Sequence, residues 1–310
     1  MVSFEWQDQP DESTRAGIVE LLVAARASDG RPDMAGDGSL PDEFRGGRYL
    51  VATDRGGVVG CAHLDTSGDA YGRRVVEMAV HPDHRGRGIG AELTQRVVDA
   101  AGADRGGDTL RAWSHGDHPG ARALAERFGF DRARELWVMR CTATDSTGAP
   151  RWSETALPAG LTLRTFVPGD DDQALVDLNA RAFSWHPEQA AFSPADLRDE
   201  QRADWFDPAG FFLAEHSDGT LAGFHWTKIH PANPYRFGGH PVGEVYVLGV
   251  DPRSQGAGVG KALTVAGLRY LVARGLGQII LYVEGDNAAA IAVYRRLGFE
   301  LDETDVQYSY

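Results

Sequence analysis

The sequence is poor in cysteine and lacks any long apolar run. Its two cysteines, Cys61 and Cys141, form no CxxC pair, so we expect reduced, buried thiols in a cytoplasmic protein. No apolar run approaches the roughly eighteen residues of a membrane span. Residues 1–10 have neither a basic start nor an apolar core, so no signal peptide is expected.

Basic residues are also in deficit, because the 310 residues carry a formal net charge of −14. Phosphate backbones bind to basic surfaces, so nucleic acid is not an expected partner. Histidines 81, 84, 115 and 118 could suggest a metal site, but no HxxxH or HExxH helix pattern accompanies them. We therefore expect no metal site.

What the sequence does contain is one unit written twice. Residues 75–90 (VVEMAVHPDHRGRGIG) align without a gap with residues 245–260 (VYVLGVDPRSQGAGVG), 170 positions later. Residues 113–130 match residues 282–299 at a distance of 169 positions. A repeat of this length indicates domain duplication. We expect a first domain over residues 1–141, a polar linker over 142–160 and a second domain over 161–310.

Each half is expected to form a mixed α/β sheet covered by helices. In the first half the patterns predict helices over residues 13–27 (with Ser13 as N-cap), 89–101 and 119–128, and strands over 49–53, 58–64, 75–80, 110–114 and 135–141, the last closing the unit. In the second half they predict helices over 172–182, 194–205, 261–273 and 288–296, and strands over 161–166, 210–216, 220–230, 245–250, 278–284 and 304–310.

A glycine-rich loop separates a predicted strand from a predicted helix in each half. Glycines permit a tight turn and leave N–H groups bare at a helix N-terminus, where an anion such as pyrophosphate binds. Residues 86–90 read GxGxG and not the GxGxxG of a dinucleotide fold. Residues 256–261 fall one residue short of GxxxxGK, and Ala262 replaces the hydroxyl that would bind magnesium. A purely structural role for this glycine turn is disfavoured, because the same loop occurs in both halves.

Both loops fit the pattern [Q/R]-x-x-G-x-[G/A], as RGRGIG at residues 85–90 and QGAGVG at 255–260. Here, and at the block GDNAAAIAVYRRLGF (residues 285–299), the chain resembles the GCN5-related N-acetyltransferase (GNAT) superfamily. The resemblance implies two tandem GNAT domains that bind acetyl-CoA, with its pyrophosphate on the loop and its pantetheine arm along a splayed strand. The implied contacts are Met78, Ala79, Val80, Arg85, Gly86, Arg87, Gly88, Ile89, Gly90 and Ala91 in the first half, and Leu248, Gly249, Val250, Gln255, Gly256, Ala257, Gly258, Val259, Gly260, Lys261, Asn287, Ala288 and Ala292 in the second.

The second half looks like one branch of that superfamily, the mycothiol synthase family. It carries HPEQ (186–189), WFDP (205–208), GFHWTK (223–228), GEVYVLGVDP (243–252) and LYVEGDN (281–287). The resemblance implies transfer of acetyl from acetyl-CoA to the cysteinyl amine of cysteinyl-glucosaminyl-inositol, the last step in making mycothiol, by a monomer that needs no metal. The substrate-side candidates that it implies are Asp37, Glu188, Lys228, Glu244 and Tyr282.

Three groups of the second half are predicted to carry the chemistry. Side chains alternate along a strand, so Glu244, Tyr246, Leu248 and Val250 are expected on one face. By the resemblance, the N–H of Leu248 holds the thioester oxygen and Glu244 receives the proton of the acceptor amine. Tyr294 would hydrogen-bond the departing CoA thiolate. A solvated carboxylate and a core tyrosine are the structural alternatives.

The first half is predicted to lack this chemistry. By the repeat, Arg74 stands at the position of Glu244, Ala125 at that of Tyr294 and His118 at that of Asn287. Glu77 falls on the strand face opposite to position 74, so it is expected to be a poor substitute. Three alternatives stay open: a tandem enzyme that acetylates another small amine such as an aminoglycoside, one that acetylates protein N-termini, and a CoA-binding sensor without turnover.

Overall fold

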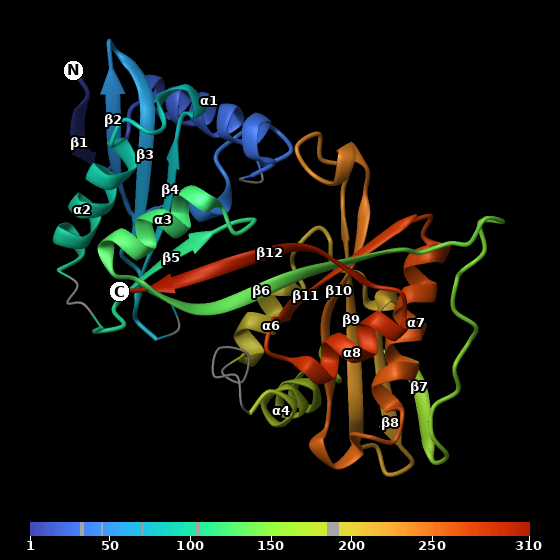
Figure 1. Ribbon diagram of the computed structural model, residues 1–310. Coiled ribbons are helices and arrows are strands. Elements are labelled where there is room, and N and C mark those ends of the chain that lie inside the picture. The colour runs from blue at the N-terminus through green and yellow to red at the C-terminus, as the bar shows by residue number, and fades with distance from the viewer. Residues whose placement is uncertain (32–33, 45, 70, 103–105, 185–191) are drawn as a thin grey trace.

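One mixed sheet of twelve strands runs through both halves of the chain in this computed structural model. The structure describes residues 1–31, 34–44, 46–69, 71–102, 106–184 and 192–310. The strand order is β1-β2-β3-β4-β5-β12-β6-β11-β10-β9-β8-β7. Within these ranges only the pairs β4–β5 and β10–β11 are parallel. Figure 1 shows the strands of the first half on one side and those of the second half on the other.

The repeat of the sequence is a repeat of secondary structure. The first half contains β1 (Ser3–Gln7), α1 (Glu12–Asp29), β2 (Arg48–Asp54), β3 (Gly57–Asp65), β4 (Arg74–Val80), α2 (Ile89–Ala101), β5 (Leu110–Ser114), α3 (Pro119–Phe128) and β6 (Asp131–Thr142). The second half contains β7 (Leu161–Thr165), α4 (Asp172–Ala182), α6 (Pro194–Glu200), β8 (Phe211–His216), β9 (Leu221–His230), β10 (Val242–Val250), α7 (Val259–Ala273), β11 (Gln278–Glu284), α8 (Ala288–Arg296) and β12 (Glu300–Ser309).

Most predicted elements are confirmed, and three details are corrected. Strand β1 was not predicted; it pairs with β2 along the edge of the sheet. The N-cap of α1 is Asp11 and not Ser13, because the carboxylate of Asp11 accepts the N–H of Thr14 at 2.7 Å. Helix α6 ends at Glu200 instead of continuing to residue 205.

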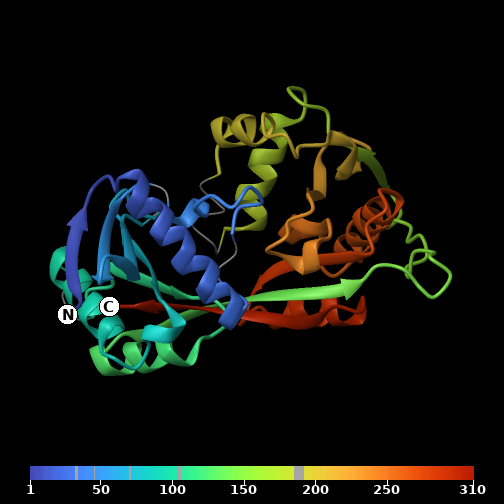
Figure 2. The same cartoon turned by 90° about the horizontal axis from the view of Figure 1, so that it is seen from above.

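Helices cover both faces of the sheet in each half. In the first half, alternate residues of β2 face opposite ways: Leu50 packs in the cluster with α2, whereas Val51 packs in the cluster with α1. In the second half, α7 and α8 cover one face and α4 and α6 the other. In Figure 2 the blue helix α1 and the green helix α3 lie on opposite sides of the first-half strands. Each half therefore has two apolar layers, one on each side of its strands.

The two halves exchange their last strands. Strand β6 does not close the sheet of the first half next to β5 as predicted; it pairs with β11, with Met139 opposite Leu281. Strand β12 takes the place beside β5, with Val306 opposite Ser114, and it also pairs with β6. Figure 1 shows the red β12 and the green β6 crossing between the halves together. The division into domains at residues 141 and 161 therefore stays a prediction, because the sheet is continuous across it.

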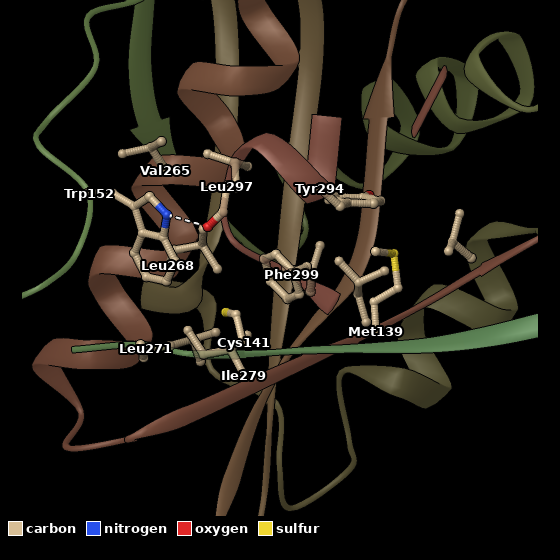
Figure 3. Packing of buried hydrophobic residues seen from close by; sticks show 14 of the residues in the cluster. Met139, Cys141, Trp152, Val265, Leu268, Leu271, Ile279, Tyr294, Leu297 and Phe299 are labelled. Carbon is tan, nitrogen blue, oxygen red and sulfur yellow. Dashed lines mark hydrogen bonds between the residues drawn. The ribbon is translucent and has the colours of Figure 1, made fainter. Parts of the chain in front are cut away.

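The segment 142–160 is held against the second half. Its buried Trp152 donates a hydrogen bond from Nε1 to the carbonyl oxygen of Leu297 at 2.8 Å, beside Leu268 and Phe299 (Figure 3). Both cysteines are buried and free. Among the described residues no helix has the length and apolar character that crossing a membrane requires.

Candidate active site

The sheet opens between β10 and β11. The two strands pair only from Gly243 to Val245, opposite residues 279–281 of β11, and no further pairing joins them in the part of the chain that the structure describes. On its other edge β10 stays paired with β9 as far as Val250. The splayed strand that the GNAT resemblance implied is therefore present, and β4 leaves β5 at Val76 in the same way.

The backbone N–H of Leu248 points into this opening. The N–H of Asp251, just after β10, donates to the carbonyl oxygen of Ala222 just inside β9 at 2.9 Å. Successive N–H groups of a strand point to opposite edges, so those of Val250 and Leu248 are directed away from β9. This orientation is the one that a donor to a thioester oxygen requires.

A β-bulge at Tyr246 shifts the alternation of side chains along β10. The pairing with β9 changes register between Val245 and Val247. Tyr246 and Val247 consequently both pack in the cluster with α4 and α6, whereas Leu248 packs beneath α7 and α8. The prediction that positions 244, 246, 248 and 250 share one face is wrong: the Leu248 and Val250 side chains lie opposite to that of Glu244.

The bulge adds one residue to β10, so the distance between equivalent residues of the two halves increases by one across it. In the parallel pairs, Gly243 lies opposite Ile279 and Arg74 lies opposite Leu110, so Gly243 and Arg74 are equivalent. The first-half equivalent of Glu244 is therefore Val75 and not Arg74, whose guanidinium instead donates to a carbonyl oxygen at the end of α2. Beyond the bulge the distance becomes 170.

The sequence analysis predicted that Glu77 is a poor substitute for Glu244 because it compared Glu77 with position 74, which is not the equivalent of Glu244. It shares the face of Val75, which is the face that carries Glu244 in the second half. Its buried carboxylate lies 3.3 Å from Nε2 of His115, whose Nδ1 lies 3.4 Å from Asp305 of β12. Burial opposes the charge of His115, but the two carboxylates outweigh it and raise the pKa of His115 to about 10.

Both glycine loops end as helix N-termini with no side chain on their amides. Gly258 is the N-cap of α7 with φ of 95° and no side-chain hydrogen bond, and Gly88 caps α2 in the same way with φ of 84°. Only glycine adopts these left-handed values without strain. The amides of the first turns, including that of Lys261, are thus left for an anion.

Most basic residues near the loops are already paired. The guanidinium of Arg85 contacts Asp29 at 2.5 and 2.8 Å. In the second half Arg253 contacts Asp251 at 2.8 Å, and this hydrogen bond lowers the pKa of that carboxyl. Lys261 is exposed and has no ion pair within the described ranges.

Glu244 is buried on the face opposite to α7 and α8. The residue as a whole is 5% exposed, and its Oε2 lies 2.5 Å from Nε2 of His230 at the end of β9. Lys228 stands directly opposite Glu244 in the pairing of β9 with β10. Tyr282 of β11 lies on the same face, and Arg236 donates a hydrogen bond to its hydroxyl. These contacts bring three of the predicted substrate-side residues, Lys228, Glu244 and Tyr282, together.

The remaining substrate-side candidates are less informative. The ammonium of Lys228 lies 4.3 Å from the ring of Trp205 and 4.7 Å from that of Tyr246, whose hydroxyl donates to Glu200 at 3.1 Å. Asp37 accepts the N–H of Ser39 at 2.9 Å in a first-half loop. Glu188 lies outside the described residues.

Tyr294 lies on the other side of the opening from Glu244. It is buried in the cluster beneath α7 and α8, with its ring centroid 5.9 Å from that of Phe299 (Figure 3). Burial raises its pKa to about 12, so the phenol stays protonated at neutral pH. Asn287 caps α8, accepting the N–H of Ala290 at 3.1 Å.

The first half contains an open cavity of about 480 Å³ at the predicted acetyl-CoA position. Its lining includes all ten of the predicted first-half residues except Arg87, which contacts His84 at 2.9 Å. Glu77, His115 and Arg31 line its far end. The cavity combines apolar walls with bare amides, as a bound acyl thioester with a pyrophosphate requires.

His230, Arg236 and Trp205 were missed by the sequence analysis. A histidine at the end of a strand has no distinguishing pattern, and only the pairing of β9 with β10 brings His230 to Glu244. The sequence did contain one signal: residues two apart along a strand share a face, so residues 228 and 230 lie on the same face of β9 as Glu244 does on β10.

Comparison with known proteins places both halves in one family. The acetyltransferase (GNAT) family matches residues 173–299, and an acetyltransferase (GNAT) domain matches residues 45–132. A mycothiol acetyltransferase of Saccharomonospora viridis is 56% identical over 100% of this chain and 99% of that relative. One of Amycolatopsis mediterranei is 55% identical over 98% of each chain. The chain belongs to the mycothiol acetyltransferase family.

Solved structures agree with the tandem GNAT fold of this mycothiol acetyltransferase family member. A GCN5-related N-acetyltransferase from Sphaerobacter thermophilus superposes with a TM-score of 0.75 at 24% identity, over 99% of this chain and 95% of that one. A tandem GNAT protein from the clavulanic acid biosynthesis pathway has a TM-score of 0.67 at 22% identity, over 100% and 98%. At these identities the likeness shows the fold alone.

Proposed function

We propose that this protein is a mycothiol synthase, which transfers acetyl from acetyl-CoA to the cysteinyl amine of cysteinyl-glucosaminyl-inositol. The observation that carries the proposal is the identity of 56% over the full chain with a mycothiol acetyltransferase. Acetyl transfer is the activity of the family, and acetyl-CoA is the donor that GNAT domains imply.

The second half is proposed to bind the donor along β10. The pyrophosphate would lie on the first-turn amides of α7, with Lys261 as the nearby cation and residues 255–260 around it. The pantetheine arm would lie in the opening beside residues 248–250 and extend toward Asn287, Ala288 and Ala292 at the start of α8. This path supports placing the thioester at the narrow end of the opening, near Val245.

Glu244 is proposed to accept the proton of the attacking amine. An α-amine has a pKa of roughly 7.7–8.0, so on the order of a tenth is neutral at pH 7 and little base strength is required. As the C–N bond forms, charge develops on the carbonyl oxygen, and the N–H of Leu248 is the donor aimed into the opening. The proton of the new ammonium passes to Glu244.

Tyr294 is proposed to donate a hydrogen bond to the sulfur when the C–S bond breaks. With its pKa raised to about 12, the phenol is a weaker acid than an ordinary thiol, whose pKa is roughly 8.5. Full proton transfer to the thiolate is therefore uphill, and stabilisation by a hydrogen bond is the proposed role. Lys228, Tyr282 and Asp37 are proposed to contact the polyhydroxylated acceptor.

The first half is proposed to hold acetyl-CoA in its cavity without turnover. It has Val75 and Ala125 at the positions of Glu244 and Tyr294. Glu77 is on the acceptor face, but His115 already engages its carboxylate. The predicted loop residues line the cavity, and these contacts support binding of acetyl-CoA without acetyl transfer.

An acetylation assay tests the proposal. Thiol release from acetyl-CoA is measured with the cysteinyl acceptor, with an aminoglycoside, with a peptide N-terminus and with no acceptor. We expect turnover with the cysteinyl acceptor alone. Turnover with the aminoglycoside or the peptide alone would reassign the substrate, and acetyl-CoA binding without turnover in any arm would make the protein a sensor.

A further inference from the structure

The buried position of Glu244 raises the question of how it loses its proton after each turnover. Its side chain is 6% exposed, whereas the side chain of His230, 2.5 Å away, is 22% exposed. His230 thus joins the carboxylate to a partly open position at the end of β9, where residues 231–241 begin. A carboxylate that accepts a proton in every cycle needs such a contact, since the acceptor covers it while it binds.

We propose that His230 is a positioning and proton-relay residue for Glu244. It fixes the orientation of the carboxylate by the short contact from Nε2 to Oε2, and it carries the accepted proton away from the carboxylate to solvent. The inference rests on the proposed role of Glu244, and it adds a residue with no place in the predicted site.

The other groups around Glu244 do not perform this role. Lys228, directly across from it on β9, has its side-chain nitrogen over the rings of Trp205 and Tyr246 and is occupied there. The hydroxyl of Tyr282 is engaged by Arg236, and burial raises the pKa of that phenol.

The hydroxyl of Tyr246 is likewise already used, because it donates to Glu200 of α6. The side chain of His230 has no hydrogen bond except the one to Glu244 among the residues described, so its Nδ1 is available to water. An imidazole with one nitrogen on a carboxylate and the other on solvent is suited to proton transfer.

The proposed step balances as follows. The amine nitrogen forms a bond to the thioester carbon, the C–S bond breaks, and one proton of the resulting ammonium moves to an oxygen of Glu244. That proton passes to Nε2 of His230, which becomes an imidazolium. The imidazolium releases a proton from Nδ1 to water, Glu244 is again ionised, and exchange of the ring proton with water returns His230 to the tautomer with a bare Nε2. No oxidant, reductant or further reactant is consumed.

Substitution of His230 tests the proposal in the intact protein. His230→Gln keeps a hydrogen-bonding amide near Glu244 but carries no proton, and His230→Ala leaves space for added imidazole. His240→Gln is the matched control, because His240 is an exposed histidine in the loop between β9 and β10. We expect His230→Gln to lower kcat about tenfold with KM for acetyl-CoA unchanged, and His240→Gln to lower neither.

Two readouts separate a relay from a structural role. Imidazole should restore the activity of His230→Ala in a concentration-dependent manner, and it should not change that of His240→Gln. In the Glu244→Gln background, His230→Gln should cause no further loss, because both residues act in one step.

The possible failures are distinguishable. An unchanged kcat in Glu244→Gln would reject the role of Glu244 itself. A large loss in Glu244→Gln together with full activity in His230→Gln would reject the relay alone. Loss of activity in His230→Gln that follows a lowered melting temperature, without rescue of His230→Ala by imidazole, would also overturn it.

Discussion

At the scale of single residues, the polar groups of the site lie on opposite faces of the sheet. Glu244 is buried beside the half-buried Lys228 and His230 on one face, and Tyr294 is buried under the helices of the other. Because the sheet opens between β10 and β11, one ligand extending through the gap reaches both faces. In the proposed mechanism each group acts at its own end of the reacting centre, the carboxylate at the nitrogen and the phenol at the sulfur.

Replacement of Glu244 tests the carboxylate. Glu244→Gln removes the proton acceptor and keeps the size of the side chain, so we expect kcat to fall by about 10²–10³ with KM for acetyl-CoA unchanged. Steady-state thiol release measures both constants. Glu126→Gln, on the exposed side of α3, is the control and should retain full activity. A fall of less than threefold in Glu244→Gln would contradict the assignment.

Replacement of Tyr294 tests the phenol. Its pKa of about 12 means that it remains protonated up to that pH, so the alkaline limb of the rate profile below pH 10 should belong to other groups. We expect Tyr294→Phe to lower kcat about tenfold while the shape of the pH profile stays that of the parent. A parent profile that loses an alkaline ionisation near pH 9 upon this substitution would argue against the raised pKa.

At the scale of elements, the sequence predicted the strand–loop–helix unit but did not predict the bulge in its strand. The patterns predicted α2, α3, α4 and α8 with their observed bounds, because apolar periodicity and capping residues are local signals. The bulge at Tyr246 depends on how β9 pairs with β10, which is not local.

A matched pair of glycine substitutions tests which half supplies the donor for catalysis. Gly258→Ala and Gly88→Ala each place a Cβ at a left-handed N-cap with no atom within 4 Å, so both should cost about 1–2 kcal/mol of stability. We expect Gly258→Ala to raise KM for acetyl-CoA about tenfold and Gly88→Ala to leave it unchanged. Melting temperatures and steady-state kinetics provide the measurements. Equal effects on KM would assign turnover to both halves.

At the scale of the whole molecule, the halves are joined by strands and by charges. Asp305 of β12 contacts His115 and, at 3.3 Å, Arg31, and both of these residues line the first-half cavity. Neither this exchange of strands nor these contacts could be predicted from the sequence, because residues 110 and 310 are distant along the chain and each strand satisfies its pattern in either place. The tandem GNAT fold itself was predicted correctly, since the repeat and the loops specify each unit.

The charge on His115 predicts a pH dependence of stability. Its pKa is raised from 6.5 to about 10 in the folded protein, so its contribution is complete below pH 6.5 and is lost as the pH rises to about 10. We expect the melting temperature to fall over this interval and His115→Gln to flatten that fall. A parent melting temperature that is constant between pH 6.5 and 10 would contradict the prediction.

Separation of the halves tests the strand exchange. A chain of residues 1–160 lacks β12, so β5 and β6 have an empty place between them. We expect residues 1–160 and residues 161–310 each to aggregate or to give poorly dispersed amide spectra, and the two together to recover the dispersion of the intact protein. Independent folding of either half would show that β12 and β6 are dispensable to its partner.

The position of β12 after all the other described strands also bears on how the protein is made. Domains usually fold one after another as they emerge from the ribosome, the earliest first. Here the part translated first waits beside an unfilled gap until residues 300–309, which follow both halves' other described strands, have emerged. A chain that stopped before residue 300 would therefore contain two incomplete units instead of one finished unit and one damaged unit.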